Sequence, residues 1–175
     1  TNLIYGKNAV TETLNSGREI DTVYIQKGAA LSKIVALAKK NGVVIKEVSD
    51  ERLTAICGTP KHGGTAAELA AASYSTVEDI LANAEQRGKP PFIIIADEIE
   101  DPHNLGAIIR TAEAAGADGL IIPKRRSASL NATVFKTSAG AAAWLKVARV
   151  ANLVDTIKRL KEAGVWVYGM EADGT

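Results

Sequence analysis

The sequence predicts an α/β protein of two parts, a small α/β unit followed by a larger unit with an open parallel sheet. Three observations support this fold class. Strand-like and helix-like stretches alternate along the chain, as where crossover helices connect strands. The runs FIIIA (92–96) and GLIIP (119–123) are continuously apolar, which is typical of strands covered on both faces. Between the two parts, Gly88 and the pair Pro90 and Pro91 end a helical pattern.

The first part, residues 1–73, has the signals of alternating helices and strands. Val10 and Leu14 have helical spacing, and Gly17 ends that helix. Further along we expect a strand at 21–28, a helix at 31–42, a strand at 43–49 and a short helix at 51–58. Residues 59–72 form a glycine-rich turn and a segment with no assigned element. Residues 74–90 are expected to link the two parts, with a helix capped by Thr76.

The second part, residues 91–175, has a βαβαβ order, which predicts a parallel sheet with helices on both sides. The expected strands are 92–98, 117–123 and 165–171. The expected helices are 104–116, an alanine-rich helix at 130–145, and 152–164.

Composition narrows the possible functions. A chain of 175 residues with a net charge of +1 has no general attraction to nucleic acid, so such a partner must contact a local patch. The single cysteine, Cys57, cannot form an internal disulfide, which fits a reducing cytoplasm. No apolar run approaches the roughly 18 residues of a membrane span, so we expect a cytoplasmic protein with no membrane partner. Because the chain begins without Met, we expect it to be part of a longer product.

The loop after the first apolar strand is a candidate site, because ligands of open α/β sheets bind beyond the carboxyl ends of the strands. Backbone amides around Asn104 to Gly106 would favour an anion at a helix start. Four nearby acids, in the segment 97–101, argue against a simple anion cradle, and their spacing matches no calcium loop. Solvated acids and a helix cap are therefore favoured over a metal site. Neither dinucleotide nor P-loop fingerprints occur.

Arg110 interrupts an otherwise small and apolar helix. One interpretation is a surface ion pair with Glu113, worth under about 1 kcal/mol. The other is that the side chain leans back toward Asn104 and binds a phosphate with its planar fork.

The densest basic cluster is Lys124, Arg125 and Arg126, followed by Lys136. It is a candidate contact for a phosphate backbone, although short basic runs usually form solvated loops. The histidines, His62 and His103, lie in loops with no nucleophile beside them, and each alone is more often a capping or solvated residue.

Taken together, these residues resemble a known family. The segment DEIEDPHNLGAIIRTAEAAGADGLII resembles the first motif of the SpoU (TrmH-type) branch of the SPOUT RNA methyltransferases, and KTSAGA resembles the next. The front segments IYGKNAVTETLNSG, DTVYIQKG and KHGGTAA are similar to the small ribosomal-protein-like RNA-binding domain of the branch that methylates large-subunit ribosomal RNA. The resemblance covers nearly all of the chain.

The resemblance implies methyl transfer from S-adenosylmethionine to a ribose 2′-hydroxyl of RNA, most often a guanosine of 23S ribosomal RNA, with a transfer RNA as the alternative. The family's asparagine and arginine fall on Asn104 and Arg110. Because a guanidinium is a poor general base, we expect Arg110 to hold a phosphate and stabilise an oxyanion. The matching segments also make His62 and Ser138 expected RNA contacts, beside the basic cluster.

The sequence also departs from the family. His62-Gly63-Gly64 stands where relatives usually have His-Gln-Gly. The later glycine-rich and SLN segments, which form a trefoil knot and most of the cofactor pocket, are missing; SASLNATV precedes KTSAGA and is not their equivalent. Only the loop with Gly169 and Met170 is expected to contact the cofactor. We therefore expect the 175-residue chain alone to be inactive, and the complete protein to be a homodimer.

Two other classes stay open. One is a non-catalytic RNA-binding module, and the other is an α/β enzyme for small molecules. Binding to ribosomal RNA at varied salt would separate them, because phosphate contacts give a steep negative slope.

Overall fold

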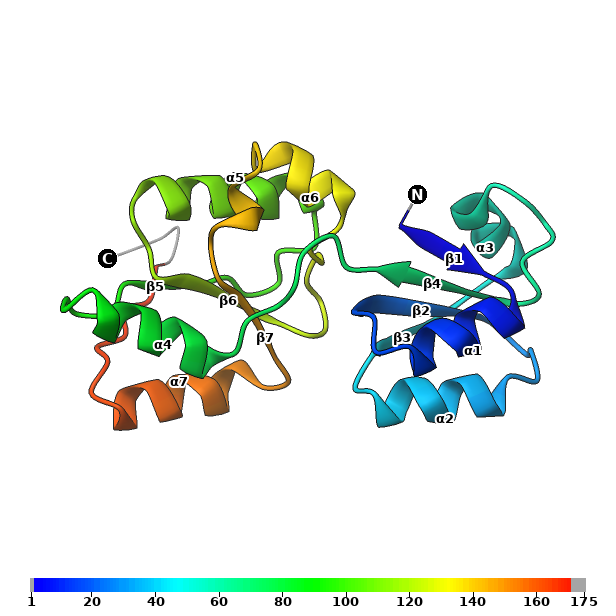
Figure 1. The fold of residues 1–175 in the computed structure, drawn as a ribbon, viewed down its shortest axis with the longest axis horizontal. Helices are drawn as coiled ribbons and strands as arrows, with labels where there is room; N and C mark the ends of the chain where they lie inside the picture. The colour runs from blue at the N-terminus through cyan, green and yellow to red at the C-terminus, as the bar shows by residue number, and fades with distance from the viewer. Residues whose placement is uncertain (1, 171–175) are drawn as a thin grey trace.

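The computed structural model describes residues 2–170 and shows two α/β units side by side along the long axis of the molecule (Figure 1). The mixed α/β fold with a parallel sheet in its second unit confirms the predicted fold class.

The first unit has a four-stranded sheet in the order β1-β4-β2-β3. Strands β2 and β3 are parallel, whereas β4 pairs antiparallel with both β1 and β2. Helices α1 and α2 cover one face of the sheet, where Val10, Val23 and Ile34 are buried together, and α3 lies on the other face (Figure 1). The elements are β1 (Leu3–Tyr5), α1 (Lys7–Asn15), β2 (Ile20–Gln26), α2 (Ser32–Lys40), β3 (Val44–Val48), α3 (Asp50–Cys57) and β4 (Thr65–Leu69).

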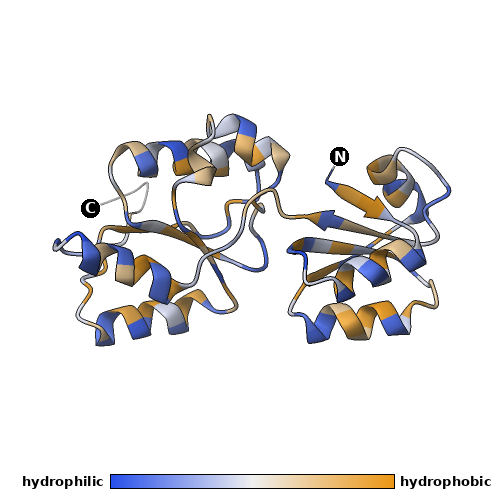
Figure 2. Ribbon diagram, in the orientation of Figure 1, coloured by the Kyte–Doolittle hydropathy of each residue, from blue (hydrophilic) through white to orange (hydrophobic). Residues whose placement is uncertain are grey.

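The second unit has a parallel sheet in the order β5-β6-β7. Helices α5 and α6 cover one face, and α4 and α7 cover the other (Figure 1). Figure 2 shows hydrophobic strands between helices that alternate hydrophobic and hydrophilic residues, so the continuously apolar runs follow from burial on both faces. The elements are α4 (Val77–Gln86), β5 (Ile93–Ile95), α5 (Pro102–Ala114), β6 (Gly119–Pro123), α6 (Ala132–Thr137), a 3-10 turn (Ala141–Ala143), β7 (Val147–Val150) and α7 (Leu153–Glu162).

Two expected elements of the second unit differ in the structure. The alanine-rich helix ends at Thr137 because Ala139 and Gly140 both have positive φ values, 52° and 84°, which an α-helix cannot continue through. The third strand is β7, whereas residues 165–170 form no strand and Glu171, the last residue of the expected strand, lies outside the described residues.

The connection between the units is shorter than the sequence suggested. Most of the segment 74–90 is helix α4, capped by Thr76 as predicted, with Ile80 buried against the second sheet. The residues before α4 run along β7, where the Ser75 N–H donates to the Val147 carbonyl (2.8 Å) and Ser75 bridges to Ala148 in parallel. The chain therefore joins the second unit from about residue 71 onward.

Candidate functional site

The loops that follow β5 and β6 meet at the carboxyl edge of the second sheet. The Ala128 N–H donates to the Ile99 carbonyl (2.7 Å), and Arg126 pairs with Glu98 at 2.5 Å. Both members of this ion pair have φ = 54°, a left-handed conformation that costs a non-glycine residue on the order of 1 kcal/mol or more. Such backbone strain is often found at functional sites.

Asp101 closes the start of α5. Its Oδ1 accepts from the N–H groups of His103 (2.6 Å) and Asn104 (3.2 Å), and Pro102 occupies the first turn. The Leu105 N–H donates to the Asp101 carbonyl. The helix cap expected from the acidic loop is thus present. The Asn104 and Leu105 amides are therefore already used inside the chain, by the Asp101 carboxylate and carbonyl, in agreement with the cap that the sequence favours over an anion cradle.

Arg110 lies on the exposed side of α5, opposite the buried Leu105 and Ile109. Within residues 2–170 it forms no ion pair, so the surface pair with Glu113 is not made. Around the axis of α5, Asn104 is six residues from Arg110 and points about 120° away from it. His103 is seven residues from Arg110 and points in nearly the same direction, about 20° away. The guanidinium is therefore available to a ligand, with an exposed His103 on the same side of the helix.

The two segments that carry the family resemblance in this unit pack directly on each other. A Cβ on Gly106 of α5 would lie 1.9 Å from Thr137 Oγ1 and 3.0 Å from the Ser138 nitrogen, so only glycine permits this approach. Ser138 is buried, where its hydroxyl donates to the Phe135 carbonyl (3.1 Å) and accepts from the Ala142 N–H (3.3 Å). Lys136 is exposed nearby. RNA contact by Ser138 stays a prediction, and its described contacts are internal.

His62 lies in the first unit and is buried. Its Nε2 is 3.1 Å from Thr54 Oγ1, and its Nδ1 accepts from the Gly64 N–H at 3.2 Å. Asp50 Oδ1 is 3.6 Å from the same Nε2. These contacts order the loop before β4, so an effect of His62 on RNA binding would be exerted through the loop.

A cleft of about 1050 Å³ lies between the two units. One wall is the first sheet around β2 and β3, and the other is the loop that carries Lys124, Arg125 and Arg126. Six basic and three acidic residues line the cleft, so its local charge is positive although the net charge of the chain is only +1. The basic residues are Lys39, Lys46, Lys124, Arg125, Arg126 and Arg149, and the acidic ones are Glu47, Glu68 and Glu100.

The first-unit wall contains a half-buried acid, Glu68, that no sequence pattern singled out. The Tyr24 hydroxyl donates to Glu68 Oε2 at 2.9 Å. Burial raises the pKa of Glu68 above its ordinary value of 4.5, and the hydrogen bond from Tyr24 only partly offsets this. Burial, with the neighbouring Glu68 charge, likewise raises the pKa of Tyr24. The wall therefore disfavours the charged form of Glu68.

We expect Glu68→Gln to stabilise the chain more at pH 7 than at pH 4. A carboxyl whose pKa is raised by folding contributes its full stability below the unfolded value and loses it as pH rises through the folded value. Glutamine resembles the protonated acid and has no such loss. Urea unfolding at both pH values measures the difference, with exposed Glu47→Gln as the control that should change little at either pH. An equal gain at pH 4 and pH 7 would contradict the argument.

Gly169 and Met170 do not form a pocket in the described residues. A Cβ on Gly169 would meet nothing within 4 Å, and Met170 is 98% exposed. Residues 2–170 also contain no group of three or more His, Cys, Asp or Glu side chains placed to bind a metal. No helix in the same range is both long and apolar enough to cross a membrane.

The sequence interpretation missed the cleft residues contributed by the first unit and by β7. Lys39, Lys46 and Arg149 line the cleft, but Lys46 and Arg149 stand alone in the sequence and Lys39 has only Lys40 beside it. The only signal was a pair of charged residues, Lys46 and Glu47, inside an apolar strand pattern. Their convergence with the predicted Lys124 to Arg126 cluster depends on how the units pack.

Both parts of the chain match known protein families. Residues 91–175 match the model of the SpoU rRNA methylase family, and residues 3–75 match the model for RNA 2′-O ribose methyltransferase substrate binding. A TrmH family tRNA/rRNA methyltransferase of Bacillus subtilis is 44% identical over 173 residues, covering 97% of this chain and 69% of that protein. A tRNA/rRNA methyltransferase of Synechocystis is 41% identical over 174 residues, covering 97% of this chain and 45% of that protein.

Among solved structures, the chain is matched to an RNA methyltransferase of the TrmH family from Porphyromonas gingivalis. It has a TM-score of 0.47 and 21% identity, with 98% of this chain and 63% of that chain covered. An rRNA methyltransferase from Sinorhizobium meliloti has a TM-score of 0.44 and 25% identity, with 92% of this chain and 58% of that chain covered.

Proposed function

The chain belongs to the TrmH family of tRNA/rRNA methyltransferases, and we propose that it acts in the transfer of a methyl group from S-adenosylmethionine to a ribose 2′-hydroxyl of RNA. Membership confirms the resemblance found in the sequence. The chain spans 69% of the Bacillus subtilis relative and 58% of the Sinorhizobium meliloti structure, so the reaction and its substrate stand as proposals.

Arg110, which is exposed and forms no ion pair within residues 2–170, carries the proposal. A guanidinium donates hydrogen bonds and has no acceptor, so it is a poor general base for the proton of the 2′-hydroxyl. It can bind the phosphate next to the target ribose and stabilise negative charge that develops on the 2′-oxygen. Asn104, on the first turn of the same helix, is proposed to orient the target nucleotide. Holding the nucleotide in a reactive geometry supplies much of the rate.

The methyl donor is proposed to be S-adenosylmethionine, which supplies an activated methyl group when bound. The described residues do not fit a site for it, because Gly169 and Met170 are exposed and lack neighbours. We therefore assign no step of the reaction to those two residues, and we expect no measurable binding of S-adenosylmethionine by this chain alone.

The RNA is proposed to lie in the positively charged cleft. The loop with Lys124, Arg125 and Arg126 forms one wall, and Lys46 lies on the other. Phosphate contacts from both walls would supply affinity without reading sequence. Lys136, exposed at the end of α6, is proposed to extend this surface.

The substrate is proposed to be a guanosine of 23S ribosomal RNA. Residues 3–75 match a substrate-binding unit. The sequence resemblance to a ribosomal-protein-like RNA-binding domain favours ribosomal RNA over transfer RNA. We propose a cytoplasmic homodimer. Trp144, which is 82% exposed beside the buried Ala141 and Ala142, is the kind of residue that an interface would cover.

Methylation by the protein expressed from its complete reading frame tests the proposal. Ribosomal and transfer RNA from a strain without the gene are incubated with labelled S-adenosylmethionine, and 2′-O-methyl positions are mapped. Incorporation into large-subunit RNA is expected. Incorporation into transfer RNA alone would favour the alternative substrate. Salt-dependent RNA binding without incorporation would identify a non-catalytic module.

A further inference from the structure

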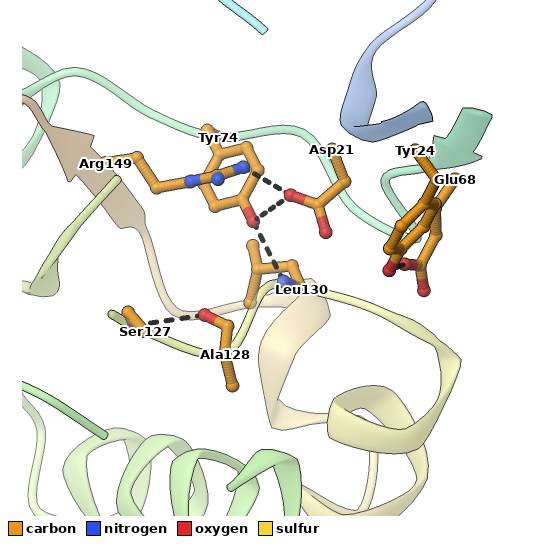
Figure 3. Close-up of polar contacts among 8 residues, drawn as sticks. All are labelled: Asp21, Tyr24, Glu68, Tyr74, Ser127, Ala128, Leu130 and Arg149. Atoms are coloured by element: carbon orange, nitrogen blue, oxygen red, sulfur yellow. Dashed lines mark hydrogen bonds and ion pairs between the residues drawn. The ribbon is translucent and has the colours of Figure 1, made fainter. Parts of the chain in front are cut away.

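A buried polar cluster connects the two units (Figure 3). It contains Asp21 of β2, Tyr74 of the connection and Arg149 of β7. The Tyr74 hydroxyl donates to Asp21 Oδ1 (3.0 Å) and accepts from the Leu130 N–H (2.9 Å). The Arg149 guanidinium pairs with Asp21 and lies over the Tyr74 ring, 4.8 Å from its centroid. One tyrosine thus contacts the first sheet, the second sheet and Leu130, in the segment that follows the basic loop.

The cluster is withdrawn from water. Asp21 is fully buried, and the Arg149 side chain is 12% exposed. Asp21 Oδ2 has no hydrogen-bond partner among the described residues. A buried ion pair adds little net stability, but removing one partner leaves an uncompensated charge and is strongly unfavourable. The cluster therefore adds little to the stability of either unit. Its main effect is to favour the one arrangement of the units in which Asp21 and Arg149 are paired.

Among residues 2–170, the buried apolar clusters do not extend from one unit into the other. The buried apolar cluster of the first unit contains only residues of that unit. The two apolar clusters of the second unit contain no residue of the first unit. From the connection they include Ala72 and Tyr74. Units without a shared apolar interface move relative to each other by default. Hydrogen bonds attach the connection to the second unit, as from the Ala71 N–H to the Leu130 carbonyl (2.8 Å).

The cluster also lies at the cleft. Arg149 is one of the residues that line it, and Leu130 follows the basic loop that forms its second wall. Across the cleft, a Cβ on Gly42 would lie 3.8 Å from Lys124 Nζ, so the two walls already approach each other. A change in the orientation of the first unit would move one wall away from the other.

We propose that Asp21, Tyr74 and Arg149 hold the cleft at a fixed width, which makes Asp21 and Tyr74 positioning residues for RNA. The inference rests on the proposed function, in which RNA occupies the cleft. With the cluster intact, both walls contact the same RNA segment at once. Without the cluster, the first unit is held to the second only by the connection. Its RNA contacts then increase the affinity only as far as the effective concentration set by that connection allows.

The test compares two fully buried aspartates that each pair with an arginine. Asp21→Asn breaks the pair between the units, and Asp118→Asn breaks the pair with Arg87 (2.6 Å) inside the second unit. Donor and acceptor dyes are placed at exposed Lys33→Cys and Lys158→Cys in a Cys57→Ser background, and single-molecule energy transfer reports the distance between the units. Filter binding to ribosomal RNA at several salt concentrations reports the phosphate contacts.

We expect Asp21→Asn to broaden the distance distribution, weaken RNA binding about tenfold and make its salt dependence shallower, because one wall is lost. Asp118→Asn should lower thermal stability but leave the distribution and the RNA affinity unchanged. Tyr74→Phe keeps the ring under Arg149 and removes both hydroxyl hydrogen bonds, so it should broaden the distribution less than Asp21→Asn does.

A wild-type distance distribution in both Asp21→Asn and Tyr74→Phe would overturn the proposal. So would a broadened distribution with unchanged RNA affinity, because the cluster would then not position RNA. If the unchanged protein fails to bind RNA, the proposed function fails, while the distance measurements still decide whether the cluster fixes the two units.

Discussion

Arg110→Ala is expected to lower the rate of methyl transfer to RNA by a factor on the order of 10² to 10³, the usual cost of losing one donor that stabilises charge in the transition state. The side chain is exposed and unpaired in the described residues, so the variant should fold normally. Losing one phosphate contact should also reduce the salt slope of RNA binding by about one. Methylation rates, circular dichroism and filter binding of the protein expressed from its complete reading frame measure the three effects.

Two further variants separate the possible roles of Arg110. Glu113→Gln removes the residue with which Arg110 would pair on the surface, and its rate should be unchanged. Arg110→Lys keeps the charge but loses the planar fork, so an intermediate rate is expected. Normal methyl transfer by Arg110→Ala would refute the assignment, and a comparable loss in Glu113→Gln would show that a surface pair matters instead.

The second expected result concerns the contact between α5 and α6. Gly106→Ala would bring a Cβ to 1.9 Å from Thr137 Oγ1, so the two helices must separate. Overpacking of this kind costs typically about 1–3 kcal/mol, which outweighs the roughly 0.5–1 kcal/mol that alanine gains over glycine in a helix. Urea unfolding should show the loss. Methylation should fall too, because α5 carries Asn104 and Arg110.

A double-mutant cycle tests the cause of the Gly106→Ala effect. Thr137→Ala removes the atom at 1.9 Å and leaves the Cβ at 2.8 Å, so it should restore part of the stability in the Gly106→Ala background. Strictly additive effects of the two substitutions would mean that the loss arises elsewhere, for example in the backbone of α5.

Local pattern predicted the elements that carry strong periodicity. The strands β5 and β6 and the helices α2, α5 and α7 lie where the sequence placed them. It missed β4, because TAAEL has small residues and no β-branched run, and this strand depends on partners on both sides. The residues Val, Trp and Tyr predicted a strand at 165–171. Residues 165–170 pair with no strand among the described residues.

Local sequence also predicted only the part of the candidate site that lies within one continuous segment. Asn104 and Arg110 belong to one continuous motif on one helix, so local sequence was enough to single them out. The cleft required knowing that Lys46 and Arg149, more than a hundred residues apart in the chain, line the same space. Nor does a sequence pattern reveal that Asp21 and Tyr74 meet Arg149, since each alone is an ordinary residue of a strand or a connection.

Helix α4 lies before the segment that matches the SpoU methylase family, yet it packs in the same unit as that segment. The SpoU methylase match begins at residue 91, yet Ile80 of α4 fills the space beside Gly119 and belongs to the buried cluster with Ile121 and Leu160. Ser75 extends the edge of the same sheet at β7. A recombination event that exchanged catalytic halves between relatives at residue 91 would pair the α4 of one relative with the sheet and α7 of the other, so the buried contacts of Ile80 would no longer be matched. A viable crossover point therefore lies some twenty residues earlier than the family boundary.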